Sequence, residues 1–321
     1  MERMMRALVT GGAGFIGSNL VKRLGNRGYH VTVIDNLKNS LPEQAKKALN
    51  GDLCDVFGVE DIRDIRSIKK YFKDVDFVFH LAANADVPSS VSDPEYDFTT
   101  NVIGTKNVLE CVLEFGCKRV LFSSSAAVYG GVKETVDENA ILAPISPYGA
   151  SKACGEMMAQ AYKNAYGLPV SIVRIFNSYG PHQRHYVMVD LFKKIVEAKG
   201  GMIEVLGNPD IVRCYCFVSD TIKAFEEIVL CPSAEGEVFN IAGSKNTKIS
   251  ELVDILSASV SRYFKAPLEA KYTGVSWKGD LNFLSGNIEK IKRVVGWEPS
   301  VDLKTGVDML VDDLYSRIDC K

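Results

Sequence analysis

Residues 6–35 read RALVTGGAGFIGSNLVKRLGNRGYHVTVID, and this stretch decides the fold. An apolar strand runs into glycines at positions 11, 14 and 17, and apolar residues then recur at helical spacing. A second apolar strand follows at residues 30–34. The order of strand, glycine-rich turn, helix and strand is typical of a parallel sheet with helices packed on its faces.

The glycine spacing suits a dinucleotide. Glycines permit a tight turn, close approach of the backbone to a pyrophosphate and close packing of helix on strand. The N-terminus of the following helix then offers N–H groups to the anion. The second strand ends in Asp35, where a carboxylate binds an adenosine ribose and repels a 2′-phosphate. The sequence therefore predicts NAD rather than NADP, with a turn residue before Asn36 as the alternative interpretation of Asp35.

A second stretch, residues 144–162, reads PISPYGASKACGEMMAQAY and predicts a helix. Tyr148 and Lys152 are four residues apart, which places them one turn apart on that helix. An ammonium group there favours the phenolate and lowers the pKa of the tyrosine from its usual value of about 10. Such a tyrosine can act as a base toward an alcohol. The structural alternative is a packed tyrosine beside a solvated lysine, which this motif alone does not exclude.

Bulk properties exclude several classes of protein. The chain has 321 residues with 46% hydrophobic and 24% charged content, as in globular proteins of one or two domains. A net charge of −2 argues against nucleic acid as the main partner, and no apolar run is long enough for a membrane span. The N-terminus shows no signal peptide. Eight cysteines without paired spacing predict reduced thiols of a cytoplasmic protein and no metal site.

Further strands alternate with helices along the first half of the chain. Strands are predicted at residues 76–83, 119–122 and 170–175, with an amphipathic helix at 97–115. Ligands of such sheets bind at the carboxyl ends of the strands. Four candidate residues fall at those ends: Gly11, Asp35, Ala82 and Ser125.

We therefore expect an α/β fold, with a Rossmann-type doubly wound parallel sheet and a smaller α/β C-terminal substrate domain. The predicted domains are residues 1–178 for NAD and residues 179–321 for the substrate. A strand and helix near residues 214–245 are expected to return to the main sheet. Asp220 is expected to cap a helix that begins at residue 221.

Many ordered motifs resemble the extended short-chain dehydrogenase/reductase family, and within it the NAD-dependent sugar-nucleotide epimerases and dehydratases. The resemblance covers residues 6 to 310 and is carried by TGGAGFIGS (10–18), VIDNL (33–37), DIRD (61–64), HLAA (80–83), NVIGT (101–105), SSSAAVYG (123–130), SPYGASK (146–152), RIFNSYGP (174–181) and FNIAG (239–243).

The resemblance implies roles for particular residues. The catalytic residues would be Ser125, Tyr148 and Lys152. The cofactor-binding residues would be Gly11, Gly14, Phe15, Ile16, Gly17, Asp35, Asn36, Asp61, Ile62, Leu81, Ala82, Ala83, Asn101, Ser123, Tyr148 and Lys152. The substrate-binding residues would be Ser125, Tyr148, Asn177, Arg213 and Lys278.

The two residues after Ser125 distinguish between reactions. Relatives that dehydrate a sugar carry an Asp-Glu pair there, whereas this chain has Ala126 and Ala127, whose methyl groups transfer no proton. The resemblance then implies 4-epimerisation of a nucleotide-diphosphate sugar through a 4-keto intermediate. UDP-glucose and UDP-galactose, or their N-acetylhexosamine or uronic acid forms, are the expected substrates. A 4-ketoreductase and a non-enzymatic NAD-binding regulator are the alternatives.

The second half departs from the family pattern. Trp277-Lys278-Gly279-Asp280 replaces the usual Arg-x-Gly-Asp, so one arginine for the diphosphate is missing and Lys278 is its expected substitute. Leu284 stands where some relatives carry a tyrosine against the sugar, which would leave room for an N-acetyl group. The resemblance also implies a homodimer through the helices at 97–115 and 150–165, whose apolar faces are otherwise intramolecular core.

Overall fold

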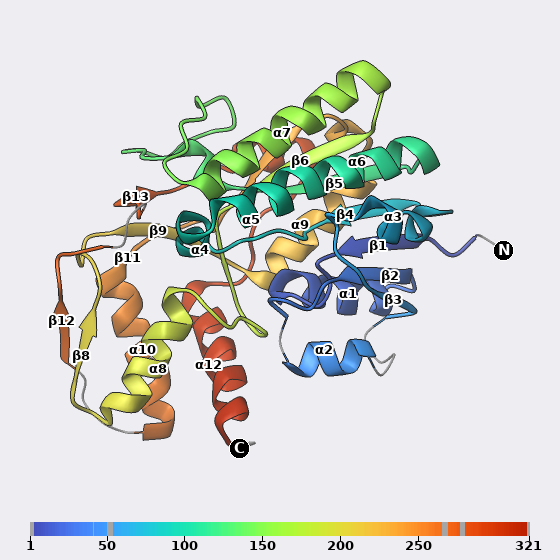
Figure 1. Cartoon of the computed structure of the whole chain (residues 1–321). Helices are drawn as coiled ribbons and strands as arrows, with labels where there is room; N and C mark the ends of the chain where they lie inside the picture. The colour runs from blue at the N-terminus through green and yellow to red at the C-terminus, as the bar shows by residue number, and fades with distance from the viewer. Residues whose placement is uncertain (1–2, 41, 50–53, 265–268, 277–279, 320–321) are drawn as a thin grey trace.

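A seven-stranded parallel sheet forms the centre of the molecule (Figure 1). The computed structural model describes residues 3–40, 42–49, 54–264, 269–276 and 280–319. The strand order is β10-β6-β5-β4-β1-β2-β3. The strands are β1 (Arg6–Thr10), β2 (His30–Asp35), β3 (Val56–Val59), β4 (Phe77–His80), β5 (Arg119–Ser125), β6 (Val170–Ile175) and β10 (Val238–Ile241). The order reverses between β1 and β4, and sheets of this kind bind ligands at such a point.

Alternate residues of each strand enter two separate cores, one on each face of the sheet. Val9 belongs to a core that includes residues of α1 (Phe15–Asn26), α9 (Val218–Leu230) and α11 (Glu289–Val295), whereas Leu8 belongs to the core of the opposite face. That opposite face is covered by α3 (Ile65–Ile68), the 3₁₀ turn η1 (Lys69–Phe72), α6 (Gly104–Phe115) and α7 (Pro147–Tyr166). The fully buried strands explain the near-continuous apolar runs in the sequence.

The helix expected at 97–115 is longer and less regular than predicted. It begins with α5 (Pro94–Phe98), passes through a π-helical segment η2 (Thr99–Ile103) and continues as α6. The shorter segments elsewhere are α2 (Pro42–Leu49), α4 (Val87–Ser92), η3 (Ala126–Tyr129) and η4 (Pro232–Ala234).

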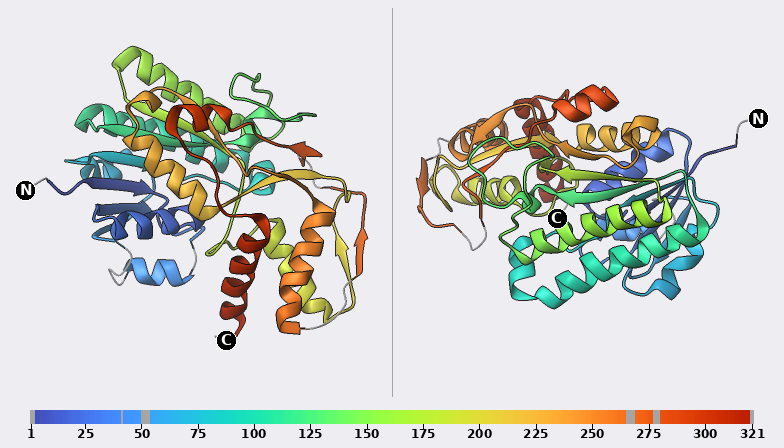
Figure 2. Two further views of the ribbon diagram at one scale, coloured as in Figure 1. Left: turned by 180° about the vertical axis from the view of Figure 1, so that it is seen from behind. Right: turned by 90° about the horizontal axis from the view of Figure 1, so that it is seen from above.

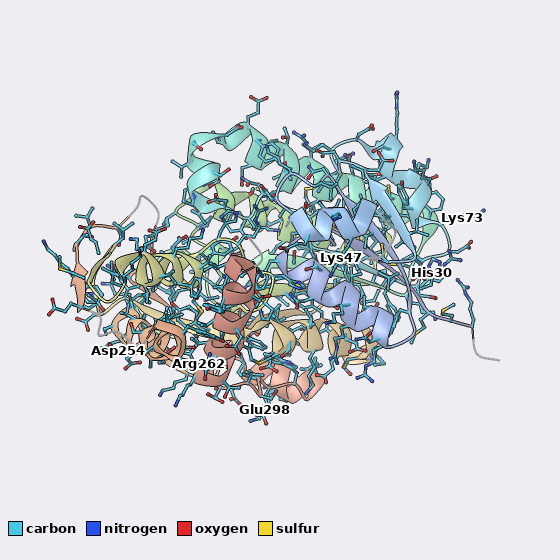
Figure 3. All side chains as sticks on the ribbon, turned by 90° about the horizontal axis from the view of Figure 1, so that it is seen from below. His30, Lys47, Lys73, Asp254, Arg262 and Glu298 are labelled. Atoms are coloured by element: carbon cyan, nitrogen blue, oxygen red, sulfur yellow. The ribbon has the colours of Figure 1, made fainter. Side chains whose placement is uncertain are left out.

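A second lobe follows the sheet and has its own core, in which α8, α10 and α12 pack together and against short strands (Figure 2). Its elements are β7 (Asn177–Tyr179), α8 (Val187–Ala198), β8 (Met202–Val205), β9 (Val212–Phe217), β11 (Asn246–Lys248), α10 (Ile249–Phe264), β12 (Glu269–Tyr272), β13 (Phe283–Leu284) and α12 (Leu303–Asp319). Seen from below, Lys47 on α2 marks the sheet side, and Asp254 and Arg262 on α10 mark the second lobe (Figure 3).

The chain crosses from the second lobe back to the sheet through α9 and β10. β9 pairs with β7, β11 and β13 in the second lobe, and β10 then pairs with β6 at the edge of the main sheet. Of the segment near residues 214–245, the helix and β10 therefore lie with the main sheet, whereas β9 does not.

The predicted cap at Asp220 is wrong. Helix α9 begins at Val218, so Asp220 lies inside its first turn. The buried carboxylate instead accepts hydrogen bonds from the amides of Ser300 and Val301, both at 2.9 Å, and from Ser300 Oγ at 2.8 Å. Asp220 therefore fastens α9 to the segment that precedes α12.

Among the described residues, no helix combines the length and apolar character that crossing a membrane requires. The cysteines of the same residues are free thiols.

Candidate active site

The glycine loop after β1 is packed so tightly that side chains would not fit. Gly11 has a φ of +74°, and a Cβ there would lie 2.7 Å from the amide nitrogen of Ala82. A Cβ on Gly17 would lie 2.1 Å from the carbonyl oxygen of Gly11. Helix α1 begins after Gly14 without a side-chain cap and without an acidic residue in its first turn. The loop and helix end therefore form a cradle that suits an anionic pyrophosphate.

Asp35 ends β2 beside this cradle. Its carboxylate accepts hydrogen bonds from the amides of Ala13 at 3.0 Å and Leu37 at 2.8 Å. Burial raises the pKa of Asp35, and these two hydrogen bonds oppose that shift. The carboxylate is thus fixed at the place where the ribose of a dinucleotide is expected.

The three predicted catalytic residues come from β5 and α7. Tyr148 lies in the first turn of α7, whose cap Ser146 accepts a hydrogen bond from the Gly149 amide at 3.1 Å. Ser125 is the last residue of β5. Lys152, one turn after Tyr148, is 4% exposed, and its Nζ donates to the carbonyl of Ser123 at 2.7 Å. All three side chains line one cavity.

The expected lowering of the tyrosine pKa is not found in the protein itself. Burial raises the pKa of Tyr148 to about 12; a hydrogen bond with Ser125 opposes this shift and Asp97 adds to it. Burial also lowers the pKa of Lys152 to about 8, against the opposing influence of Asp97 and Glu156. The physical reason is that folding removes both the phenol and the ammonium from water, which disfavours the charged form of each. In addition, the ammonium donates its hydrogen bond to the carbonyl of Ser123 and not to the phenol.

The cavity has a volume of about 530 Å³ and extends from the glycine loop to the second lobe. This size is in the range of small-molecule sites. The predicted residues that line it are Gly11, Gly14, Phe15, Ile16, Gly17, Asp35, Asn36, Ile62, Leu81, Ala82, Ala83, Ser123, Ser125, Tyr148, Lys152, Asn177 and Arg213. Residues from the ends of six strands of the parallel sheet, β1 to β6, thus meet in one place, as the alternation of strands and helices predicts.

Among the described residues, two predicted ones are not among those that line the cavity, and a third prediction falls outside the described residues. Asn101 is buried behind it, where its side-chain amide donates to the Asn84 carbonyl at 3.0 Å and to Ser151 Oγ at 3.0 Å. Asp61 lies in a shallow neighbouring hollow and pairs with Arg63 at 2.8 Å. Although burial opposes it, hydrogen bonds from Arg63 lower the pKa of Asp61 to about 2. Lys278 lies outside the described residues.

Arg213 brings positive charge to the far end of the cavity. Its Nη2 donates to Asp280 Oδ1 at 2.8 Å and to the Leu281 carbonyl at 2.5 Å, and its Nη1 donates to the Val212 carbonyl at 2.8 Å. The side chain is 11% exposed. The guanidinium is thereby held in one orientation where it can contact an anionic ligand.

A buried ion pair supports the catalytic strand from behind. Glu156, one turn after Lys152, accepts hydrogen bonds from Arg174 at 2.8 and 3.0 Å and also one from Ser124 Oγ. Arg174 Nη1 further donates to the hydroxyl of Tyr129 at 2.9 Å. The pair joins α7 to β5 and β6 next to the catalytic residues, so it fixes their relative positions.

Sequence reasoning missed part of the cavity wall. Lys38 and Ser40 after β2, and Tyr186 before α8, also line the cavity. The Lys38 ammonium lies 3.2 Å from the centroid of the Tyr96 ring. These contacts depend on how loops from distant parts of the chain meet, and no local pattern in the sequence signals them.

Comparisons with known proteins agree with this geometry. Residues 8–310 match the family model described as GDP-mannose 4,6 dehydratase. The UDP-glucose 4-epimerase of Mycolicibacterium smegmatis is 33% identical over 96% of this chain and 98% of its own length.

Solved structures give a similar picture. The UDP-glucose 4-epimerase of Thermotoga maritima, solved with UDP-glucose, superposes with a TM-score of 0.88 at 33% identity, covering 98% of this chain and 100% of that one. The UDP-glucuronic acid 4-epimerase of Bacillus cereus, solved with UDP-glucuronic acid and NAD, has a TM-score of 0.88 at 28% identity, with coverage of 98% and 100%.

Proposed function

The chain belongs to the GDP-mannose 4,6-dehydratase family of short-chain dehydrogenase/reductase enzymes, and we propose that it is an NAD-dependent 4-epimerase of a UDP-hexose. The relatives that act on UDP-glucose and UDP-glucuronic acid support this proposal. UDP-glucose and UDP-galactose are the substrates we put first, with their N-acetylhexosamine and uronic acid forms next.

One observation carries the choice of reaction. Ser125, Tyr148 and Lys152 line the cavity together with Ala126 and Ala127, whose methyl groups cannot act as acid or base in an elimination. Among the described residues, the carboxylates that line the cavity are otherwise engaged or remote. Asp35 and Glu60 lie toward the glycine loop, Asp280 pairs with Arg213, and Asp86 caps α4. This inventory favours hydride transfer at one hydroxyl over removal of water.

The residues of the glycine cradle, Asp35 and Lys152 fit NAD, and we propose Asp61, Ile62 and Asn101 as further residues of its site. When bound, NAD supplies the acceptor and donor of the hydride at C4, and its cationic nicotinamide ring favours the Tyr148 phenolate. Burial raises the pKa of Tyr148, and added positive charge beside the phenol opposes that shift.

The protein's own groups then handle the proton and the sugar. Ser125 holds the reacting hydroxyl, and Tyr148 removes its proton while Lys152 stabilises the phenolate. The 4-keto sugar turns within the cavity and presents its other face. Tyr148 returns the proton to the oxygen at C4, which completes the inversion.

Residues of the second lobe are proposed to bind the nucleotide diphosphate. Arg213 and Asn177 line the far end of the cavity, and Lys278 is proposed to supply the second charge. Leu284, which also lines the cavity, is shorter than a tyrosine and leaves room for a substituent at C2 of the sugar. We accordingly assign residues 1–178 to a cofactor domain, whose last residues reach the substrate, and residues 179–321 to a substrate domain from which α9, β10 and α11 return to the main sheet.

We further propose a homodimer, located in the cytoplasm, where free thiols are stable. The exposed sides of η2 and α7 carry apolar residues, with Ile103 at 37% and Met157 at 61% exposure. Sedimentation of the wild type at twice the mass of the chain, and dissociation by Met157→Lys, are the expected results. A wild type that sediments as a monomer at micromolar concentration would remove this part of the proposal.

The reaction is tested by incubating purified protein with UDP-glucose, UDP-N-acetylglucosamine or UDP-glucuronate without added reductant. Anion-exchange chromatography should then separate a C4 epimer from at least one of them. Tyr148→Phe should lower the rate at least about 100-fold, because the phenol oxygen is the proposed proton carrier.

The alternatives give different results. A 4-ketoreductase would convert none of these three sugars, which lack a 4-keto group, and would consume one NADH per turnover of a 4-keto sugar nucleotide. The proposed epimerase consumes no added NADH. A non-enzymatic NAD-binding protein would bind the nucleotide and convert none of the three sugars. Either result would overturn the proposed reaction.

A further inference from the structure

Tyr186, the residue before α8, has a backbone conformation that side chains rarely adopt. Its φ is +78° and its ψ is 169°, a combination found almost only in glycine. The conformation is held on the helix side, because the carbonyl of Tyr186 accepts hydrogen bonds from the amides of Val189 and Asp190, both at 3.1 Å. Strain of this kind persists when the surroundings enforce it, and it is frequent at ligand sites.

The loop that leads into Tyr186, residues 180–186, is also fastened to both lobes. Asn19 on α1 donates to the Pro181 carbonyl at 3.0 Å, and Arg317 on α12 donates to the Gln183 carbonyl at 3.0 Å. Arg184 donates to the Ser40 carbonyl at 2.5 Å. The loop therefore holds Tyr186 in a fixed position, at a cost in conformational free energy that a glycine at this position would avoid.

The Tyr186 side chain reaches the segment that leads into α4, a helix that itself contacts the catalytic helix α7. Its hydroxyl donates to the Ala85 carbonyl at 3.1 Å, in the segment that leads into α4. In the same α4, Ser90 Oγ accepts a hydrogen bond from the amide of Tyr148 at 3.1 Å. Tyr148 and Tyr186 line the same cavity. Burial raises the pKa of Tyr186, and Tyr148 and Asp86 add to that shift. The residue as a whole is 48% exposed and lines the cavity.

These contacts place an aromatic ring near the base. If Tyr148 acts on C4, as the proposed function requires, the hexose lies against Tyr148 and is bounded by the other residues of that part of the cavity. Hexoses present C–H groups on their faces, and such surfaces pack on aromatic rings, whose area is large and rigid. The Tyr186 hydroxyl is already engaged by Ala85, so the ring cannot turn away without losing that bond.

We propose that Tyr186 is a substrate-binding residue whose ring forms a wall of the hexose subsite, fastened by Ala85 and held by the strained backbone at the start of α8. The ring contacts the sugar and not the nucleotide. This inference rests on the proposed function, because Tyr148 locates the reacting carbon.

The test compares two ligands, UDP and UDP-glucose, by isothermal titration calorimetry on the NAD-loaded enzyme. Tyr186→Gly removes the ring and relieves the backbone, so its thermal stability should not fall. Its affinity for UDP-glucose should fall roughly tenfold, while its affinity for UDP stays within about twofold of the wild type. Tyr186→Phe retains the ring and should stay within about threefold for both ligands.

Lys199→Gly is the matched control. Lys199 ends the same helix α8 with a φ of +47°, so this variant also replaces a residue of positive φ by glycine, away from the cavity. It should leave both affinities unchanged.

The outcomes separate this inference from the proposed reaction. Equal losses for UDP and UDP-glucose in Tyr186→Gly, or no loss for either, would overturn the role of Tyr186. A wild type that binds both ligands but epimerises no UDP-sugar would overturn only the reaction. A wild type that binds neither ligand would overturn both.

Discussion

Burial of the Lys152 ammonium is unfavourable for folding, and the size of this cost depends on pH. Its pKa of about 8 in the folded chain is lower than the usual lysine value of about 10.4. Between these values the unfolded chain binds more protons, so stability increases as pH rises through this window. Below it, the cost of burying the ammonium is fully present.

Lys152→Met should therefore stabilise the protein while reducing activity. We expect a gain of about 1–3 kcal/mol in the free energy of unfolding near pH 7, and a smaller gain near pH 9.5. Epimerase activity should fall at least about 100-fold, because the phenolate loses its charged neighbour. Urea unfolding at the two pH values measures the first effect. A variant that is less stable than the wild type at both would show that the hydrogen bond to Ser123 outweighs the buried charge.

At the scale of single residues, the sequence predicts which side chains form the site better than it predicts their pKa values or the strain in their backbone. The spacing of Tyr148 and Lys152 places them correctly on one helix, yet it does not reveal that burial raises the tyrosine pKa. Nor does any pattern signal the strained Tyr186, whose conformation costs about 1–3 kcal/mol. Both properties arise from tertiary surroundings, namely the loss of water and the contacts of a loop with both lobes.

The glycine loop and α1 form the element on which cofactor binding depends. Gly17 and Gly25 lie in the same helix but in opposite surroundings. A Cβ on Gly17 would lie 2.1 Å from the Gly11 carbonyl oxygen, whereas a Cβ on Gly25 would meet no atom within 4 Å. The two positions therefore offer a matched pair of substitutions.

Gly17→Ala should weaken NAD binding by at least about tenfold, because the loop must move to admit the methyl group. Gly25→Ala should bind NAD normally and gain up to about 0.5–1 kcal/mol in stability, because alanine favours the helical conformation more than glycine does. Calorimetric titration with NAD and thermal unfolding measure the two effects. Equal NAD affinities in both variants would contradict this prediction, because the glycine loop would then accommodate the methyl group without loss of binding.

Most elements follow from hydrophobic periodicity, because strands buried on both faces and amphipathic helices leave clear patterns. The prediction fails where a polar side chain can form hydrogen bonds either within its own element or with a distant segment. Asp220 resembles a helix cap by its position, yet its carboxylate binds the amides of Ser300 and Val301 some 80 residues later. Such long-range bonds cannot be read from local sequence.

At the scale of the whole molecule, the site exists only because two lobes meet. The sheet supplies the cradle, Asp35 and the catalytic residues, and the second lobe supplies Arg213 and Tyr186. The chain also connects the two lobes. Strand β9 belongs to the sheet of the second lobe, and the chain then returns through α9 to β10, which lies at the edge of the main sheet. The motif order predicts which residues gather, whereas the loops that close the cavity emerge only from the assembled fold.

The central claim is that C4 is oxidised and reduced again within one enzyme molecule. It is tested most directly with UDP-hexose carrying deuterium at C4, incubated in ordinary water, with the position of the label followed by NMR spectroscopy. Our account predicts that the epimer retains deuterium at C4, because the hydride that leaves the sugar is the one that returns. Inversion with loss of the label to solvent would contradict it, since the proton chemistry would then act at carbon rather than at the hydroxyl that Tyr148 deprotonates.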